Sequence, residues 1–286
     1  MRRGWGCTAG GWQSLSAPCK LADMAEAPPV ILVIAGSDPS GGAGLQADLR
    51  AIAVHGMVGA AVVTAITVQN TRGVLDVHPV DASLVSAQIA AVLDDLPVAA
   101  IKIGMLGDEE VADAVADAIS GTEVPVVLDP VMRASAGGDL LTDAAVRVVR
   151  ERLAPLTTLV TPNLSEARVL QDGDEPDAEV LADHLGVAVL LTGGHLAGDV
   201  VTDVLDFPGG GRTREFSGQR ILTPHDHGTG CLLSTSIACA LAAGDSVEEA
   251  VEHGRRCVRA GLVNAPALGG GAGPVMLLKL PRGDSP

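Results

Sequence analysis

Residues 30–48 read VILVIAGSDPSGGAGLQAD and join an apolar run to a glycine-rich loop. The run at 30–36 has the length and composition of a buried parallel strand. Residues 44–56 then place apolar side chains at helical spacing. A strand, a glycine-rich turn and a helix in direct succession predict the first unit of an α/β fold.

The same alternation continues along most of the chain. Further strands are expected at 58–70, 74–80, 99–106, 124–132, 157–163 and 187–194, and helices at 81–96, 108–120, 142–153, 164–171 and 176–185. This order predicts a central, mostly parallel sheet with helices on both faces. Residues 200–207 and 213–222 flank the turn PGGG and predict a small antiparallel hairpin, which helices at 231–244 and 246–263 follow.

Composition and charge narrow the classes of function. The 286 residues include 19 Lys and Arg against 35 Asp and Glu, which gives a net charge of −16. This charge argues against a nucleic-acid partner, and no apolar run reaches the ~20 residues that cross a membrane. The five cysteines form no C-x-x-C pair, so we expect neither a disulfide scaffold nor the usual zinc motif. Reduced thiols indicate a cytoplasmic protein.

Residues 1–29 differ from residues 30–286 in their hydrophobic pattern. Residues 1–29 hold both tryptophans and show no periodicity, so they are expected to form a disordered extension, with Met24 as the physiological start. Residues 30–286 contain no linker or internal repeat and are expected to form one domain. Within it, His55 and His253 are interpreted as surface side chains, and Cys239 and Cys257 as small buried residues.

Six loops begin at the ends of predicted strands. They are GSDPSGGAG (36–44), VQNT (68–71), KIGML (102–106), DPVM (129–132), TPNLSEA (161–167) and TGGH (192–195). Ligands of open α/β sheets bind outside the carboxyl ends of the strands. We therefore expect these loops to converge on one crevice.

The first loop fits a dinucleotide fingerprint at residues 42–47. However, Gln69 and Asn70 stand at the end of the second strand, where a dehydrogenase needs an acidic residue for the ribose. An NAD- or FAD-dependent enzyme is therefore disfavoured. The loop is instead expected to approach a ligand closely, with Asp48 facing the same crevice.

The sequence HGTGC at 227–231 leads directly into a helix. Backbone N–H groups of Gly228, Thr229 and Gly230 would converge at the positive end of that helix and form an anion hole suited to phosphate. Cys231 lies in the first turn, where the helix dipole is expected to lower the pKa of its thiol. No lysine follows a glycine in the P-loop frame, which excludes a P-loop kinase.

Oxygen donors also gather at strand ends. Asp129, Asn163 and Glu166 are of the type that binds Mg²⁺ together with nucleotide phosphates. His225 and His227 form an H-x-H pair that lacks a third metal ligand, so a structural or substrate role is favoured over a metal.

Taken together, the chain resembles the bacterial hydroxymethylpyrimidine/phosphomethylpyrimidine kinases of the ribokinase-like superfamily. The resemblance spans residues 30–276 and rests on the ordered segments IAGSDPSGGAGLQAD, TAITVQNT, KIGML, LDPVM, TPNLSEA, GGH, HGTGC and GGGAGPV. It implies a ribokinase-like fold, the cofactors ATP and Mg²⁺, and a homodimer. It also implies phosphorylation of 4-amino-5-hydroxymethyl-2-methylpyrimidine and then of its monophosphate, giving the diphosphate for thiamine biosynthesis.

The resemblance assigns a role to each matching residue. The pyrimidine site comprises Gly36, Asp48, Gln69, Met105 and Val131. The catalytic group comprises Gly228, Thr229, Gly230 and Cys231, with Cys231 as the base because related sugar kinases carry Asp there. Asn163 and Glu166 match the motif near Mg²⁺ and the triphosphate, and Thr192 is counted with them in the nucleotide site. Asp129 joins Glu166 in the expected metal site on its residue type and its place at a strand end, not on the resemblance.

The chain departs from this pattern at two positions. Thr192 and Gly270 stand where many members carry lysines near the ATP phosphates, and Arg133 or backbone groups are the candidates to compensate. Two alternatives stay open. A pyridoxal or pyridoxine kinase would phosphorylate a similar hydroxymethyl group on the same fold, and the absent lysines leave room for a non-catalytic pyrimidine-binding protein.

Overall fold

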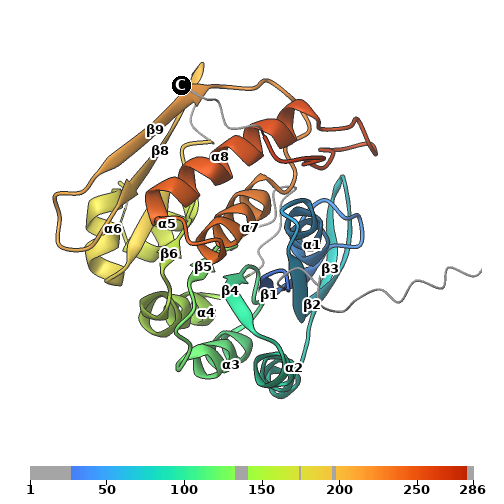
Figure 1. The fold of residues 1–286 in the computed structure, drawn as a ribbon, viewed down its shortest axis with the longest axis vertical. Helices are drawn as coiled ribbons and strands as arrows, with labels where there is room; N and C mark the ends of the chain where they lie inside the picture. Colours follow the sequence, from blue (N-terminus) through green and yellow to red (C-terminus); the bar gives the residue numbers. More distant parts are fainter. Residues whose placement is uncertain (1–26, 133–140, 174, 195–197, 282–286) are drawn as a thin grey trace, which may run out of the picture.

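A computed structural model describes residues 27–132, 141–173, 175–194 and 198–281 (Figure 1). Most of the expected extension at 1–29 lies outside these ranges, as do Arg133 and His195. Within the described ranges, no helix combines the length and apolar character required to span a bilayer.

The strands and helices fall close to the predicted positions. The strands are β1 (Val30–Ser37), β2 (Val58–Asn70), β3 (Gly73–Pro79), β4 (Val98–Ile103), β5 (Val126–Leu128), β6 (Leu159–Val160), β7 (Ala188–Leu191), β8 (Val200–Asp206) and β9 (Arg214–Gln219). The helices are α1 (Gly44–Val54), α2 (Ala82–Asp95), α3 (Glu109–Ile119), α4 (Asp143–Val148), α5 (Leu164–Gln171), α6 (Ala178–Leu185), α7 (Thr229–Ala242) and α8 (Val247–Val263). A π-helical turn (Val149–Leu153) and a 3₁₀ turn (Ala154–Leu156) follow α4.

All described strands belong to one nine-stranded sheet in the order β3-β2-β1-β4-β5-β6-β7-β8-β9. The strands from β2 to β7 in this order are parallel. The edge strand β3 is antiparallel to β2, and the predicted hairpin of β8 and β9 continues the other edge in antiparallel register. The expectation of a mostly parallel sheet with an antiparallel hairpin is confirmed.

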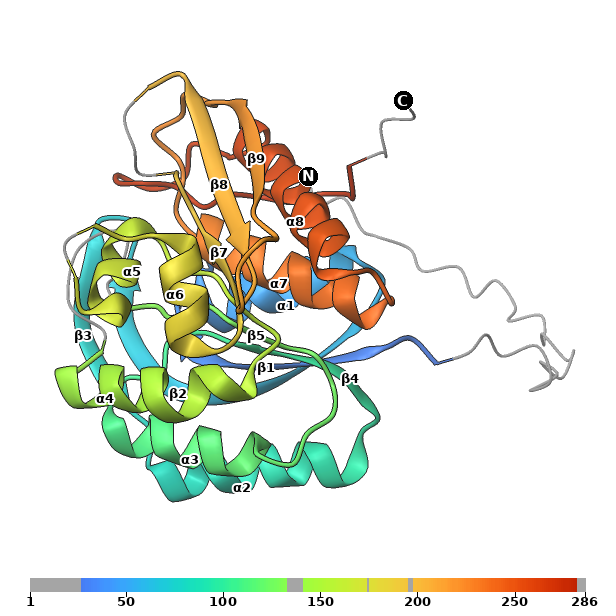
Figure 2. The ribbon, with the colours of Figure 1, turned by 90° about the vertical axis from the view of Figure 1, so that its left-hand side faces the viewer.

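Side chains alternate between two cores on opposite faces of the sheet. On β1, Leu32 and Ile34 pack on the face covered by α2 to α6, whereas Ile31 and Val33 pack on the face covered by α1, α7 and α8. In Figure 2, α2 and α3 lie on one side of the central strands and α1, α7 and α8 on the other. A strand buried on both faces needs the continuous apolar sequence that Val30–Ser37 provides.

The connectivity reverses at β1, which positions the site. The chain runs outward from β1 to β2 and β3, and then returns to β4 on the other side of β1. Such a reversal leaves a crevice beyond the carboxyl ends of the two diverging strands. Gly44 begins α1 at φ +56°, and a Cβ there would lie 2.3 Å from the Gly36 carbonyl oxygen. Only glycine therefore lets α1 begin so close to the end of β1.

Candidate active site

A cavity of about 790 Å³ opens beyond the carboxyl ends of the parallel strands. Residues from all six predicted loops line it, so the expected convergence is confirmed. The lining includes the predicted site residues Gly36, Gln69, Met105, Asp129, Val131, Asn163, Glu166, Thr192, Gly228, Thr229, Gly230 and Cys231. The volume lies within the ~300–1,000 Å³ that small-molecule sites commonly occupy.

Asp48 differs from the expectation that it faces the crevice. Its carboxylate does not line the cavity but is completely buried beneath it, where Lys102 Nζ lies at 2.9 Å. The Thr235 hydroxyl donates a second hydrogen bond at 2.7 Å. The interpretation of Asp48 as a direct substrate contact was therefore wrong, because both carboxylate oxygens already have partners in the core.

Lys102 is a cavity residue that sequence reasoning missed. It lies in β4 between apolar residues, with no solvent exposure. Burial alone would lower its pKa, but Asp48, Cys231 and Asp129 raise it above the usual lysine value. The ammonium therefore stays charged in the floor of the cavity. A lysine near the end of a buried strand was the available signal, since such a charge needs a partner or a ligand.

The environment of Cys231 overturns the expected lowering of its pKa. Burial raises the pKa of the thiol to about 12, although the Lys102 charge and the Gly44 backbone N–H act in the opposite direction. The position at the start of α7 is as predicted. The lowering effect of the helix terminus on this pKa is thus outweighed by the effect of burial.

The predicted anion loop is closely packed. Gly228 has φ +86° and caps α7, and a Cβ at this position would lie 2.0 Å from the Gly42 carbonyl oxygen. Glycine is therefore required where the two glycine-rich loops meet. The first-turn N–H groups of α7 have no carbonyl partners within the helix, and the cavity reaches them at Thr229 and Gly230. This end of the cavity is suited to an anion.

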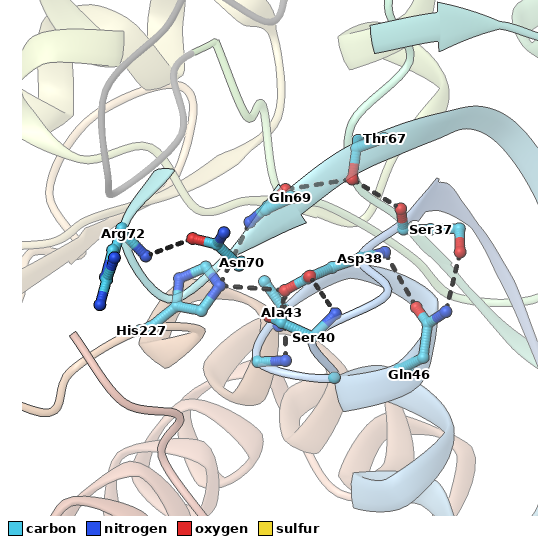
Figure 3. Close-up of polar contacts among 12 residues, drawn as sticks. Ser37, Asp38, Ser40, Ala43, Gln46, Thr67, Gln69, Asn70, Arg72 and His227 are labelled. Carbon is cyan, nitrogen blue, oxygen red and sulfur yellow. Dashed lines mark hydrogen bonds and ion pairs between the residues drawn. The ribbon is translucent and has the colours of Figure 1, made fainter. Parts of the chain in front are cut away.

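Asp38 organises the loop after β1 (Figure 3). Its carboxylate accepts hydrogen bonds from the backbone N–H groups of Ser40, Gly42 and Ala43, at 2.8, 3.2 and 2.9 Å. The ring Nε2 of His227 lies 3.0 Å away. Burial would raise the pKa of Asp38, but the bonds from His227, Ser40 and Ala43 lower it to about 2. An ionised Asp38 therefore ties this loop to the loop before α7.

The same histidine reaches the pyrimidine side of the predicted site. Gln69 Nε2 lies 3.3 Å from His227 Nε2, and the Thr67 hydroxyl donates to Gln69 Oε1 at 3.2 Å (Figure 3). The hydrogen bond from Thr67 holds the Gln69 amide at the cavity wall. His227 is buried, and its Nδ1 has no partner among the described residues. The structural role considered for the H-x-H pair fits His227.

Two buried carboxyl groups, Asp129 and Glu166, form the acidic part of the cavity. Glu166 accepts a hydrogen bond from the Asn163 backbone at 2.9 Å, within a capping box that begins α5. Burial and the neighbouring Asp129 raise the pKa of Glu166 to about 8. Burial also raises the pKa of Asp129, against the charge of Lys102. A divalent cation would relieve this repulsion, and carboxylate oxygens suit Mg²⁺, so the donor set fits that ion.

The remaining wall of the cavity is apolar, and arginine side chains stand at its edge. Its apolar lining comprises Val201, Ile221, Leu222, Val258 and Leu262. The cations are Arg220, Arg255 and Arg259, each held in place by a hydrogen bond to a carbonyl or by an ion pair. Thr192 lies in this cavity, whereas Gly270 packs against the Arg72 guanidinium outside it. The two positions that lack the expected lysines therefore lie in different surroundings.

The fold and this site are those of a ribokinase-like small-molecule kinase. A solved ADP complex of Bacillus subtilis pyridoxal kinase superposes with a TM-score of 0.79 at 32% identity, covering 88% of this chain and 98% of that one. The phosphomethylpyrimidine kinase from Clostridium difficile 630 gives a TM-score of 0.67 at 34% identity, with coverage of 79% and 96%.

Sequence comparison identifies the family. The phosphomethylpyrimidine kinase family model matches residues 38–276. A hydroxymethylpyrimidine/phosphomethylpyrimidine kinase from Rhizobium meliloti is 46% identical over 256 residues, which is 86% of this chain and 96% of the relative. The chain belongs to the phosphomethylpyrimidine kinase family.

Proposed function

We propose that this protein transfers the γ-phosphoryl group of ATP to the hydroxymethyl oxygen of 4-amino-5-hydroxymethyl-2-methylpyrimidine. A second transfer, to the monophosphate, gives the diphosphate used in thiamine biosynthesis. One observation carries the proposal: a single cavity connects the Gln69 amide and Met105 to the anion loop at Gly228–Cys231. Family membership and the names of close relatives support the same reaction.

The acceptor occupies the end of the cavity near β1. A primary amide can donate to a ring nitrogen and accept from an exocyclic amine, so Gln69 suits an aminopyrimidine edge. Met105 and Val131 supply an apolar wall for the ring, and Gly36 leaves room for it. A Cβ at Gly36 would lie 3.0 Å from the Met105 sulfur, so a larger residue would displace that wall.

ATP occupies the other end. The apolar wall on β8, the loop after β9 and α8 suits the adenine, and the arginines at its margin offer positive charge to the phosphates. Asn163 and Thr192 face the same space. Asp129 and Glu166 would hold Mg²⁺, which when bound neutralises charge on the triphosphate.

Transfer requires positioning more than covalent chemistry. The anion loop at Gly228–Gly230 stabilises the transferred group, and Lys102 supplies a fixed charge below it. Cys231 lies where the acceptor end of the cavity meets the nucleotide end, and it accepts the proton of the attacking hydroxyl. Because burial raises the pKa of its thiol to about 12, only a small fraction is ready as thiolate at neutral pH. The proximity of Lys102 favours that fraction.

Pyridoxal phosphorylation is the second candidate, because the Bacillus subtilis pyridoxal kinase superposes well on this chain. The kcat/KM values for the hydroxymethylpyrimidine and for pyridoxal, measured side by side, separate the two. The proposal expects a clear preference for the pyrimidine. A preference for pyridoxal would replace it. Pyrimidine binding without ATP turnover would identify a binding protein instead.

We also propose that residues 30–286 act as one domain in a cytoplasmic homodimer. Ile66 and Val68 of β2 and Leu75 of β3 are exposed at the sheet edge and would be covered by a second copy. Cys231, Cys239 and Cys257 are all free thiols, which fits a reducing compartment. Sedimentation of the wild type and Leu75→Asp tests the dimer, and cell fractionation tests the location.

A further inference from the structure

A cluster of two histidines and a cysteine lies outside the active-site cavity. His55 follows the last residue of α1, and His253 and Cys257 are one turn apart on α8. The two Nε2 atoms lie 2.9 Å apart, and Cys257 Sγ lies 3.4 Å from His253 Nε2 and 3.9 Å from His55 Nε2. Both histidines are partly exposed, as a surface position predicts, but each ring also lies against the other one across the contact between α1 and α8.

The surroundings orient the side chains toward a common point. His55 Nδ1 lies 2.8 Å from the Ala51 carbonyl oxygen, so this nitrogen carries the proton and Nε2 keeps its lone pair for the cluster. A backbone carbonyl on the second ring nitrogen is the usual support of a metal-binding histidine. The buried Ser236 hydroxyl, which has no other partner among the described residues, lies beside the Cys257 thiol.

The spacing matches a tetrahedral zinc site. Zinc bonds of about 2.0–2.1 Å to nitrogen and about 2.3 Å to sulfur place two nitrogens about 3.3 Å apart, and a nitrogen about 3.5 Å from a sulfur. The three distances in the cluster are within a few tenths of an ångström of these values. Both imidazoles are partly exposed, so water can reach a fourth position. Thiolate and imidazole together select zinc over the hard ion Mg²⁺.

We propose that His55, His253 and Cys257 bind a Zn²⁺ ion, with water as the fourth ligand. The ion would connect the end of α1 to α8, which are 198 residues apart in sequence at the two histidines. Helix α8 also supplies Arg255, Val258 and Arg259 to the cavity wall. Zinc would therefore stabilise the helix that forms one side of the proposed nucleotide site.

Cobalt substitution tests the ligand set directly. Full-length protein titrated with Co²⁺ is expected to develop a thiolate-to-cobalt charge-transfer band and visible bands typical of tetrahedral coordination, at one ion per chain. Cys257→Ser is expected to lose the charge-transfer band, and His253→Gln to lose the tetrahedral bands. Cys231→Ser, Cys239→Ala and His184→Gln are matched controls that are expected to retain both.

A second measurement covers variants that fold poorly. Zn²⁺ should raise the melting temperature of the wild type and of the three controls, because a ligand that binds only the folded state stabilises it. With excess Mg²⁺ present to occupy the Asp129 and Glu166 site, Zn²⁺ should leave the melting temperatures of His55→Gln and Cys257→Ser unchanged. No charge-transfer band in the wild type, or a band that survives Cys257→Ser, would overturn the proposal and leave the histidine pair as a hydrogen bond between helices.

Discussion

The Nζ atom of Lys102 lies 2.9 Å from an Oδ atom of Asp48, and neither side chain is exposed to solvent. The pair joins β4 to α1 below the active-site cavity, and only the lysine reaches that cavity. Asp48 is therefore a positioning residue, because it fixes the charge that faces Cys231 and Asp129.

Asp48→Asn is expected to lower the free energy of unfolding by about 3–5 kcal/mol, because it leaves a buried ammonium without its ion partner. Urea denaturation measures this loss. Glu109→Gln, which removes the exposed ion pair with Arg147, is the control and should cost less than about 1 kcal/mol. Equal losses in the two variants would contradict a special contribution from the buried pair.

Cys231 should give the kinase an alkaline pH profile. Burial raises the pKa of its thiol to about 12, so the thiolate fraction, and with it kcat, should rise steadily with pH across the neutral and alkaline range. Cys231→Ser should lower kcat by about 10²–10⁴-fold, the usual contribution of a general base, and remove the slope. A flat wild-type profile, or near-full activity in the serine variant, would remove the base role.

Glu166 should make the ligand-free protein less stable as the pH rises. Folding raises the pKa of this carboxyl to about 8, so the folded state holds a proton that the unfolded state releases. The stability is therefore expected to fall between about pH 4.3, the unfolded value, and the folded pKa. Thermal melts across this range measure the effect.

Glu166→Gln is the matched variant, since a glutamine can still accept the Asn163 backbone hydrogen bond of the capping box. It should remove the fall in stability and also weaken the apparent Mg²⁺ affinity in the kinase assay. Ser165→Ala, one residue away and exposed at the cavity, should do neither. A wild-type stability that rises over this range would contradict the assignment.

Introducing a lysine at Thr192 and introducing one at Gly270 should affect the KM for ATP differently. Thr192 lines the cavity, so Thr192→Lys is expected to lower the KM for ATP by about tenfold, the effect of one charge-assisted contact. Gly270 lies against Arg72 outside the cavity, so Gly270→Lys should change this KM little. Steady-state kinetics with varied ATP compare the two variants. The reverse order would show that nucleotide approaches the Gly270 loop.

Local pattern was enough to predict most of the architecture. The apolar run at β1, the helical spacing of α1 and the PGGG turn between β8 and β9 each follow from short-range rules. The convergence of loops followed from one topological rule about the carboxyl ends of parallel strands. Gly228 was predicted as part of the anion loop, whereas its φ of +86° and its close approach to Gly42 depend on how the two loops pack.

Contacts between side chains that are far apart in the sequence could not be predicted. Asp48 and Lys102 are 54 residues apart, and His55 and His253 are 198 apart, so nothing local in the sequence pairs them. The prediction of a lowered pKa for Cys231 failed for a related reason. Its helix position was visible in the sequence, but the depth of burial depends on how α7 packs against the sheet.

The most direct test of the account incubates the purified protein with ATP, Mg²⁺ and 4-amino-5-hydroxymethyl-2-methylpyrimidine and follows the products over time by mass spectrometry. The account predicts a monophosphate that rises and then declines as the diphosphate accumulates. A reaction that yields neither phosphorylated product, from protein whose melting temperature rises with the pyrimidine, would contradict it.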